Sequence, residues 1–513
     1  MSDHARTTMD RRTFMGLSAA ALGASLCYPA NAQGPAATDA PNIVFIHVDQ
    51  MSLLDSIAAY GAEHVRTPGI DRIVRNGVSF MQSHSTDPVC CPARIAWWTG
   101  TYSSENGVIV NNTPCHEDTP DLSPLLQQAG YNTYYTGKWH VPGKNVRELF
   151  HVLHEGSWWG ELTDPEVTRS ARAFLRHYND DRPFFLSVGY LNPHDICITP
   201  PLDAARSSVV DGKKVPPYKQ AGVLRDEDMP PLPSAHGYDP REPSVLRSMH
   251  RGKPDDPGRS DWSDDLWRMH RYNYHRFVEM VDREIELLLD ELAQSPWRDN
   301  TLILFSADHG DGIARHWGVG KSTFYREVVE VPFVIATLGD RLPVRKDMRD
   351  ADHLVSGIDF ARTVCDYANA DDAPLPHGRS LRPLAEGRPV SDWRRYVYAE
   401  NSAYMHMISD GRWKYVRGYE EDGEVSGLPP SRETHPIGVE QLFDLQADPD
   451  EQHNLAYAAD RQALLAEMRA AMDAEEAQRL PLRPVPHETG LSFLRNRTAV
   501  IRRHAYPRAY PIT

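Results

Sequence analysis

The sequence predicts an α/β protein built on a large, mostly parallel sheet flanked by helices, followed by a smaller α/β domain that carries an antiparallel sheet. Near-continuous apolar runs are typical of strands buried on both faces of a parallel sheet, and three occur: residues 42–48, 183–188 and 301–305. The best helix, residues 274–293, has one apolar stripe and precedes the third run, as a crossover helix does.

The same patterns divide the chain into parts. We expect a main domain over residues 41–382, with a Pro-, Gly- and charge-rich insertion at about 200–263 that walls a substrate cleft. Short strand-like pieces and a last helix around residues 460–474 predict a smaller domain over 383–479. The Pro- and Arg-rich residues 480–513 predict an extended tail.

Composition limits the kinds of partner. The chain has 513 residues, of which 41% are hydrophobic and 25% charged, so a large globular core is expected. The formal net charge of -16 argues against nucleic acid, which needs a basic face. An anionic substrate is not excluded, because a few local cations dominate the potential of one pocket.

The first 32 residues have the pattern of a targeting segment. Arg11 and Arg12 form a twin-arginine signature, an apolar stretch follows at residues 15–26, and residues 30–32 offer an Ala-x-Ala cleavage site. The alternative is a short N-terminal helix with a chance Arg pair. No other run has the ~18 apolar residues that a membrane span needs, so we expect a periplasmic or secreted protein without a membrane anchor.

Cysteine usage singles out special chemistry. Five cysteines lie beyond residue 32, at positions 90, 91, 115, 197 and 365. An odd number does not complete a disulfide framework in an exported protein. None of them has the Cys-x-x-Cys spacing of a zinc or redox site.

Polar side chains follow each of the three predicted strands. Asp49 ends the first, Asn192 and His194 follow the second, and Asp308 follows the third. Ligands bind beyond the carboxyl ends of strands in open α/β sheets, so we expect these groups to meet at one edge. The alternative for a lone aspartate is simple strand-end capping.

Cys90 opens a short motif. Residues 90–94 have the pattern Cys-x-Pro-x-Arg, and Thr99-Gly100 follows. This resembles the signature of the sulfatase family, in which the first cysteine is oxidised to formylglycine, an aldehyde that hydrates to a geminal diol. By itself the motif also fits a buried cysteine before a Pro turn.

Further segments resemble the family in the same order along nearly the whole chain beyond the targeting segment. They are residues 41–50, 67–71, 77–80, 136–140, 192–194, 308–311, 316–321, 330–333, 442–445 and 448–455. The resemblance implies the fold of the alkaline phosphatase superfamily and the hydrolysis of sulfate monoesters.

The resemblance also implies a metal site. Its ligands would be Asp49, Gln50, Asp308 and His309, with an oxygen of modified Cys90. Mostly oxygen ligands favour a hard cation, so we expect calcium, with magnesium and manganese as alternatives. Many members of the family have Asp where this chain has Gln50, whose carbonyl oxygen still ligates but whose side chain brings one negative charge fewer.

Five further residues receive roles from the resemblance. Arg94 and Lys138 would hold the formylglycine hydrate, and Lys321 would bridge a sulfate oxygen and the leaving-group oxygen. His140 would take the remaining hydroxyl proton, so that sulfate is expelled and the aldehyde is regenerated, and His194 would contact or protonate the leaving group. Weaker pocket candidates are His316, Asn111 and Asn112.

Two other functions are compatible with parts of this pattern. Phosphonate monoester and phosphodiester hydrolases of the same superfamily often share the Asp-Gln and Asp-His pairs, but tend to carry Tyr and Thr where this chain has Lys138 and His140. An inactive relative or periplasmic binding protein would retain Cys90 as a thiol.

The substrate is less well defined by the sequence. Residues 192–197 resemble some glycan sulfatases, which favours a sulfated saccharide over an aryl sulfate or choline sulfate. Trp97, Trp98, Trp158 and Trp159 would offer stacking surface for a sugar, or else fill the core. The required partner is a cytoplasmic formylglycine-generating enzyme; nothing in the sequence indicates an oligomeric state.

Overall fold

The structure is a computed structural model. It describes residues 40–156, 159–198, 208–210, 213–215, 225–237, 262–401, 405–419, 437–479 and 483–486. The predicted targeting segment, most of the predicted insertion, Trp158 and most of the tail lie outside the described residues.

In the described part of the chain the main sheet has eight strands, in the order β11-β2-β10-β9-β1-β6-β4-β5. Strand β10 is antiparallel to both of its neighbours, and the other neighbouring pairs are parallel. The strands are β1 (Asn42–Asp49), β2 (Gly77–Phe80), β4 (Asn132–Gly137), β5 (His151–Glu155), β6 (Phe184–Pro193), β9 (Thr301–Ala307), β10 (Phe333–Ala336) and β11 (Met348–Asp350). The three predicted strands are therefore β1, β6 and β9, which lie side by side at the centre of the sheet.

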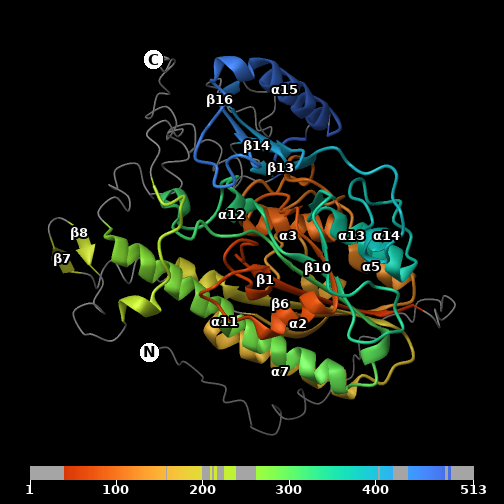
Figure 1. The fold of residues 1–513 in the computed structure, drawn as a ribbon. Helices are drawn as coiled ribbons and strands as arrows, with labels where there is room; N and C mark the ends of the chain where they lie inside the picture. The colour runs from red at the N-terminus through yellow and green to blue at the C-terminus, as the bar shows by residue number, and fades with distance from the viewer. Residues whose placement is uncertain are drawn as a thin grey trace, which may run out of the picture. The chain divides into compact units, whose positions relative to one another are not determined.

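Helices cover both faces of this sheet (Figure 1). On one face lie α2 (Pro68–Arg75), α7 (Gly160–His177) and α11 (Asp264–Gln294), which pack against Val44, Ile46 and Val48 of β1. On the other lie α3 (Cys90–Thr99), α5 (Leu122–Gln128) and α13 (Asp359–Ala368), which pack against Ile43 and Phe45. Alternate residues of β1 thus enter two separate cores, as the pleat of a strand requires.

Helix α11 begins at Asp264, well before the predicted start near Tyr274. Its N-cap is Ser263, whose hydroxyl accepts a hydrogen bond from the backbone N–H of Leu266. The first turns bury Trp267 and His270, polar or amphipathic side chains that interrupt a simple apolar stripe. Apart from this early start, the predicted crossover helix is present.

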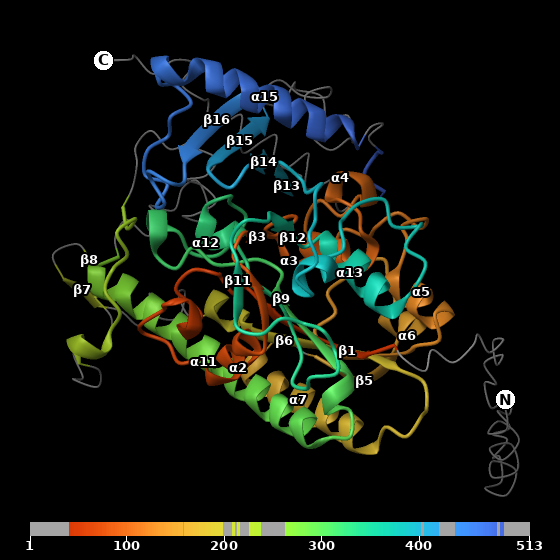
Figure 2. The same ribbon diagram turned by 45° about the vertical axis from the view of Figure 1, so that its right-hand side comes forward.

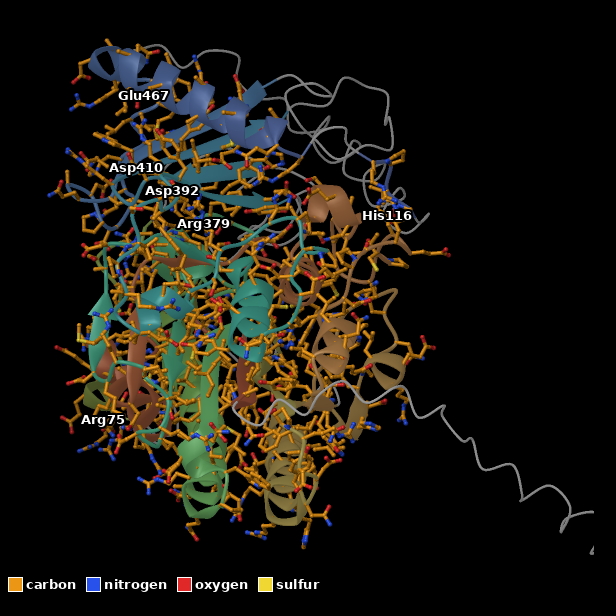
Figure 3. The ribbon with its side chains drawn as sticks, turned by 90° about the vertical axis from the view of Figure 1, so that its right-hand side faces the viewer. Arg75, His116, Arg379, Asp392, Asp410 and Glu467 are labelled. Carbon is orange, nitrogen blue, oxygen red and sulfur yellow. The ribbon has the colours of Figure 1, made fainter. Side chains whose placement is uncertain are left out.

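A second sheet of four antiparallel strands follows, as predicted. Its strands are β13 (Val397–Asn401), β14 (Met405–Ser409), β15 (Trp413–Tyr419) and β16 (Ile437–Asp444). Helix α15 (Gln462–Ala477) packs on it through Leu465, Met468 and Met472 (Figure 2). In Figure 3, Asp410 marks the turn between β14 and β15, and Glu467 marks α15.

Two residues of β13 connect this second sheet to segments before and after α3 and to the loop that carries Lys321. The carboxylate of Glu400 accepts hydrogen bonds from the backbone N–H of Ser104 (2.8 Å) and from its hydroxyl (2.6 Å), and the N–H of Glu400 donates to the carbonyl of Thr86 (2.8 Å). The amide of Asn401 donates to the carbonyl of Ser322, at 2.7 Å. These contacts hold loops on both sides of α3 and next to Lys321.

The remaining described elements are short. They are β3 (Ser83–His84), β7 (Ser208–Val210), β8 (Lys213–Val215), β12 (Val355–Ser356), α4 (Ser103–Asn106), α6 (Val146–Leu149), α12 (Arg326–Val329) and α14 (Arg382–Ala385). None of the helices in the described ranges combines the length and apolar character that crossing a bilayer requires.

Candidate active site

Four adjacent parallel strands, β9, β1, β6 and β4, end at the same edge of the main sheet. Each is followed by residues that the sequence marks as functional. Asp49 ends β1 and Gln50 follows it, Asp308 and His309 follow β9, His194 follows β6, and Lys138 and His140 follow β4. The expected meeting of strand ends is therefore present, with β4 as a fourth contributor.

Cys90 is the first residue of α3, and its side chain is completely buried. Its sulfur Sγ lies 2.6 Å from Nζ of Lys321, 3.2 Å from Nε2 of His309 and 3.8 Å from Oδ1 of Asp49. A helix N-terminus carries partial positive charge, which favours an anionic or electron-rich group at this position. The residue predicted as nucleophile thus faces two residues of the predicted metal site and one predicted catalytic cation.

The electrostatics of the site distinguish Cys90 from its neighbour Cys91. Burial and the charge of Asp49 raise the pKa of the Cys90 thiol, but Lys321, Lys138 and His309 outweigh them and hold this pKa well below its usual value. For Cys91, burial raises the pKa to about 12. The site therefore favours the reactive form of Cys90 alone.

Arg94 ties the two predicted metal-binding carboxylates together. Its Nε donates to Oδ2 of Asp308 at 2.8 Å, and its Nη2 donates to Oδ2 of Asp49 at 2.9 Å. Nζ of Lys138 lies 2.6 Å from the same Asp49 oxygen. Burial raises the pKa of Asp49, but Lys138, His194, Arg94 and Lys321 outweigh burial and lower it well below its usual value. Asp49 is thus an ionised carboxylate whose other oxygen, Oδ1, faces Cys90.

The amide of Gln50 has a defined orientation. Its Nε2 donates to Oδ2 of Asp311 at 2.7 Å, while its carbonyl Oε1 accepts from Nζ of Lys321 at 3.3 Å. Cys197, an exposed cysteine after β6, lies against the same amide with Sγ 3.3 Å from Oε1. Oε1 is the atom of Gln50 that would bind the predicted metal. It is turned toward the ammonium group of Lys321, which lies beside Cys90.

The donor atoms suit a single cation. Ligand atoms of Asp49, Cys90, Asp308 and His309 all lie within 4.8 Å of one another, and all four residues are buried. Nδ1 of His309 lies 2.9 Å from the carbonyl of Gly310, to which it donates, so in the neutral imidazole Nε2 is the nitrogen that turns an electron pair toward the site. The ammonium of Lys321 already contacts Sγ of Cys90 and, at 3.3 Å, Nε2 of His309, which shows that these donors can face one positive charge. The residues present thus fit a divalent metal ion.

The other predicted residues lie at varied distances from this centre. His194, the first residue of a short 3-10 turn after β6, is half-buried and lowers the pKa of Asp49 by its charge. His140 is half-buried with a left-handed backbone (φ 53°). His316 stacks on Tyr325, with ring centroids 3.8 Å apart. Nδ1 of His316 lies 3.0 Å from Oε1 of Glu327.

The two asparagines of the prediction lie beside α3. The side-chain oxygen of Asn111 accepts a hydrogen bond of 2.9 Å from the backbone N–H of Cys91, which gives Asn111 a helix-supporting contact. Asn112 has a left-handed backbone with φ 67°. The contact of Asn111 with the motif is thus explained without a ligand.

Sequence reasoning missed two residues that support the site, His47 and Asp311. Both are completely buried. His47 lies on β1 two residues before Asp49, where its Nδ1 is 3.3 Å from Nη1 of Arg94. Burial and the charge of Arg94 hold the pKa of His47 well below its usual value, so its imidazole is neutral. A polar residue inside an otherwise apolar strand was the available signal for His47, and the short spacing from Asp308 was the signal for Asp311.

Trp97 and Trp98 do not form a sugar-stacking surface. Each is only 2% exposed and packs in the core against Phe45. The core interpretation of these two residues is therefore correct, because α3 turns this side against the sheet. Trp159, at the start of α7, is 51% exposed.

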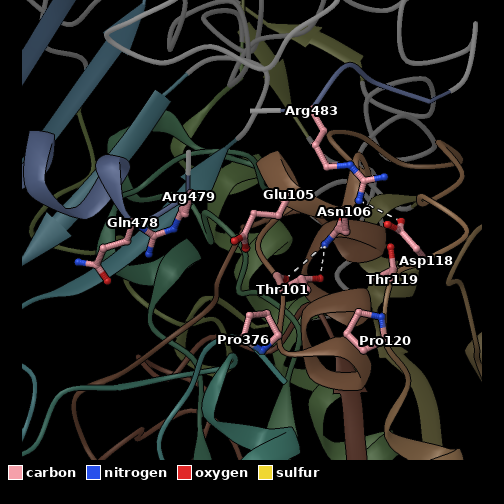
Figure 4. Close-up of a pocket in the computed structure, with 10 residues that line it drawn as sticks. All are labelled: Thr101, Glu105, Asn106, Asp118, Thr119, Pro120, Pro376, Gln478, Arg479 and Arg483. Atoms are coloured by element: carbon pink, nitrogen blue, oxygen red, sulfur yellow. Dashed lines mark hydrogen bonds and ion pairs between the residues drawn. The ribbon is translucent and has the colours of Figure 1, made fainter. Parts of the chain in front are cut away.

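A hollow of about 260 Å³ that Cys90 does not line lies beside the last turn of the C-terminal helix (Figure 4). Its cations already have partners: Arg483 pairs with Asp118 at 2.9 Å, and the guanidinium of Arg479 lies 4.0 Å from the ring of Tyr102. It contains none of the predicted site residues, so the strand-end cluster is the candidate active site.

Fold and site together combine a mostly parallel sheet between helices with a cysteine at a helix N-terminus that faces a cluster of carboxylates and cations. The sulfatase family model matches residues 41–370, and the chain belongs to the sulfatase family. It is therefore a sulfuric ester hydrolase.

Curated relatives match over most of the chain. A Δ4,5-hexuronate-2-O-sulfatase of Bacteroides thetaiotaomicron is 28% identical over 484 residues, which cover 88% of this chain and 91% of the relative. An N-acetylglucosamine-6-O-sulfatase of the same species is 25% identical over 523 residues, covering 88% and 89%. Among solved structures, a 2-O GAG sulfatase superposes with a TM-score of 0.71 at 23% identity, covering 86% of this chain and 93% of that one. The last comparison supports the fold.

Proposed function

We propose that this sulfatase hydrolyses sulfate monoesters with a formylglycine made from Cys90, assisted by a divalent cation. The observation that carries the proposal is the position of Cys90, at the first residue of α3 with Sγ 2.6 Å from Lys321 and 3.2 Å from His309. A hydrated aldehyde at this position would supply an oxygen nucleophile, and the cation would supply positive charge for the sulfate oxygens.

The cation would be held by Asp49, Gln50, Asp308 and His309. Three of these offer oxygen, which favours calcium, with magnesium or manganese as alternatives. Arg94 contributes indirectly, since its two hydrogen bonds to Asp49 and Asp308 orient one oxygen of each carboxylate and leave the other toward the site.

The remaining lysine and histidine side chains would transfer protons and stabilise the negative charge of the leaving group. Nζ of Lys321 lies 2.6 Å from Cys90 Sγ and would stabilise negative charge on the sulfate and the departing oxygen. Lys138, 2.6 Å from Asp49, would hold the nucleophile. His194 would protonate or contact the leaving group, and His140 would remove the proton that allows sulfate to depart.

We further propose that the substrate is a sulfated saccharide. Two of the relatives described above are named for saccharide substrates, a hexuronate and an N-acetylglucosamine. Exposed Trp159 offers a flat apolar ring at the start of α7, whose N-terminal N–H groups are bound by Asp195 in the turn that begins at His194.

A phosphonate monoester or phosphodiester hydrolase is the second candidate. Gln50 and His309 face the carboxylates and cations around Cys90, and their presence favours this second function. The presence of Lys138 and His140 disfavours it. The deciding experiment measures kcat/KM of the purified enzyme for sulfated saccharides, an aryl sulfate, choline sulfate and a matched phosphonate monoester. We expect a sulfate ester to be preferred, and a preference for the phosphonate of more than about tenfold, ~1.4 kcal/mol in transition-state stabilisation, would contradict the proposal.

A further inference from the structure

His47 occupies a position where packing calls for an apolar side chain. On β1 it shares a face with Ile43 and Phe45, both core residues, and it is completely buried. Its ring centroid lies 4.7 Å from that of Phe45 and 5.4 Å from that of Trp97. An imidazole is retained in such surroundings only when its nitrogens have partners.

The partners of the two nitrogens fix the tautomer of His47. Nδ1 lies 3.3 Å from Nη1 of Arg94, and a guanidinium only donates, so Nδ1 is an unprotonated acceptor. Nε2 then carries the hydrogen and donates to Oγ of Ser187 at 3.1 Å. The hydroxyl of Tyr135 donates to the carbonyl of Lys138, so its oxygen, 3.4 Å from Nε2, faces the imidazole as an acceptor.

This acceptor completes the surroundings of the Arg94 guanidinium. Nε and Nη2 are committed to Asp308 and Asp49, and Nη1 donates to the carbonyl of Lys138 at 3.2 Å as well as to His47. Rotation of the guanidinium would break contacts with both carboxylates at once. His47 contacts Nη1 of the guanidinium, while the two carboxylates contact Nε and Nη2. This contact opposes the rotation.

A second position in the sheet is shaped to receive the imidazole. Gly189 on β6 is the register partner of His47. A Cβ at residue 189 would lie 2.5 Å from Cε1 and 2.9 Å from Nε2 of His47, closer than such atoms approach. A side chain at residue 189 would therefore crowd the imidazole, which packs against Phe45 and Trp97 on its own strand's side.

We propose that His47 is a positioning residue, whose neutral Nδ1 fixes the guanidinium of Arg94 and thereby aims Asp49 and Asp308 at the cation beside Cys90. The consequence for the cation rests on the metal-assisted function proposed above. The placement of Arg94 itself does not depend on it.

The test compares three substitutions at one buried position in the full-length chain. His47→Leu fills the space without an acceptor, His47→Asn places an amide oxygen where Nδ1 lies, and His47→Gln places its amide near Nε2. Protein stripped of metal with a chelator is titrated with Ca²⁺ and, separately, Mn²⁺ by calorimetry, and stability is followed by denaturant unfolding. We expect His47→Leu to weaken cation affinity ~10- to 100-fold, His47→Asn to recover most of it, and His47→Gln to recover less.

Gly189→Ala provides a second variant, in which the added Cβ would crowd an unaltered His47 and also approach the carbonyl oxygen of Lys138 to 2.9 Å. It should lower cation affinity in the same direction as His47→Leu. A residue that only fills the core would give a different pattern, in which Asn is no better than Leu. That pattern, or wild-type affinity in His47→Leu, would overturn the proposal.

Failure of the proposed function would show in the wild-type protein, as absence of cation binding. The positioning role is then decided by a crystal structure of metal-free His47→Leu. A rotated guanidinium that has lost its contact with Asp49 or Asp308 supports the role, and an unchanged Arg94 with both contacts overturns it.

Discussion

The carboxylate of Asp311 accepts a hydrogen bond of 2.7 Å from the side-chain amide nitrogen of Gln50. Because an ionised carboxylate only accepts, this contact fixes which end of the amide is which, and Oε1 is turned toward Lys321. Burial raises the pKa of Asp311, but its contacts with His270, Ile313 and Gln50 outweigh burial and lower that pKa below its usual value. Asp311 therefore determines the atom that Gln50 presents to a cation.

Asp311→Asn should weaken cation binding. The carboxylate also accepts from the backbone N–H groups of Ile313 (2.8 Å) and Gly320 (3.0 Å), so an asparagine must point its own N–H₂ at one existing donor. We expect Gln50 to lose its fixed orientation and the affinity for Ca²⁺ to fall ~10- to 100-fold, measured by calorimetry. Asp392→Asn, on the surface, is the matched control (Figure 3). Equal affinities in the two variants would show that the orientation of Gln50 is not set by Asp311.

Cys90 and Cys91 should behave differently on substitution. Cys90→Ala should abolish nearly all activity, since it removes the only side chain on which the nucleophile is made. Cys91→Ser should remain active at temperatures where it is folded, because Cys91 lies in the core with a protonated thiol. Peptide mass spectrometry of the active wild type should find an aldehyde or its hydrate at residue 90 and an unmodified residue 91. A fully active preparation with only a thiol at Cys90 would refute the formylglycine mechanism.

His275 should make the protein sensitive to acid. It lies buried on α11, and burial together with the charge of Arg271 lowers its pKa to about 3. The unfolded chain takes up this proton near pH 6.5 and the folded chain only near 3, so the stabilisation from neutral His275 is complete above about pH 6.5 and is lost as the pH falls toward 3. One pH unit inside this window corresponds to about 1.4 kcal/mol.

Replacing His275 by Phe should therefore reduce acid sensitivity. We expect the difference in unfolding free energy between about pH 7.5 and about pH 5 to shrink by up to about 2 kcal/mol relative to wild type. Denaturant unfolding followed by circular dichroism at both pH values measures it. An undiminished difference would mean that His275 is protonated, or exposed, in the folded protein.

Export should follow maturation. We propose that Arg11 and Arg12 direct the folded protein through a twin-arginine route, and that Cys90 is modified in the cytoplasm while its segment is still accessible. Replacing both arginines by lysine should then retain the protein in the cytoplasm with Cys90 already modified. Fractionation followed by peptide mass spectrometry decides this. Retained protein with a thiol at Cys90, beside exported wild type with formylglycine, would place modification after export.

The sequence predicted the central strands and their polar ends because both signals are local. Near-continuous apolar runs mark β1, β6 and β9, and the residues after them form the candidate active site. The predicted start of α11 lies too far along the chain. Trp267 and His270 in the first turns are buried, but they do not continue the apolar stripe that marks the rest of the helix.

The supporting contacts could not be predicted from the sequence in the same way. His47 meets Arg94 from α3, and Gln50 meets Asp311 from a loop beyond β9, so both pairs depend on the register and packing of distant segments. A single sequence shows which residues are polar in apolar surroundings. It does not show which nitrogen or oxygen they turn toward one another.

The contacts of Glu400 on β13 can form only late in the synthesis of the chain. Glu400 binds Ser104 and Thr86, which lie on either side of α3 and so on either side of Cys90. Ser104 and Glu400 are 296 positions apart in the chain. At ~5 to 20 residues per second, a ribosome needs about 15 to 60 s to pass from one to the other. During that time the segment around Cys90 lacks the contacts that close it, and we propose that this is the period in which a modifying enzyme would meet it on the growing chain.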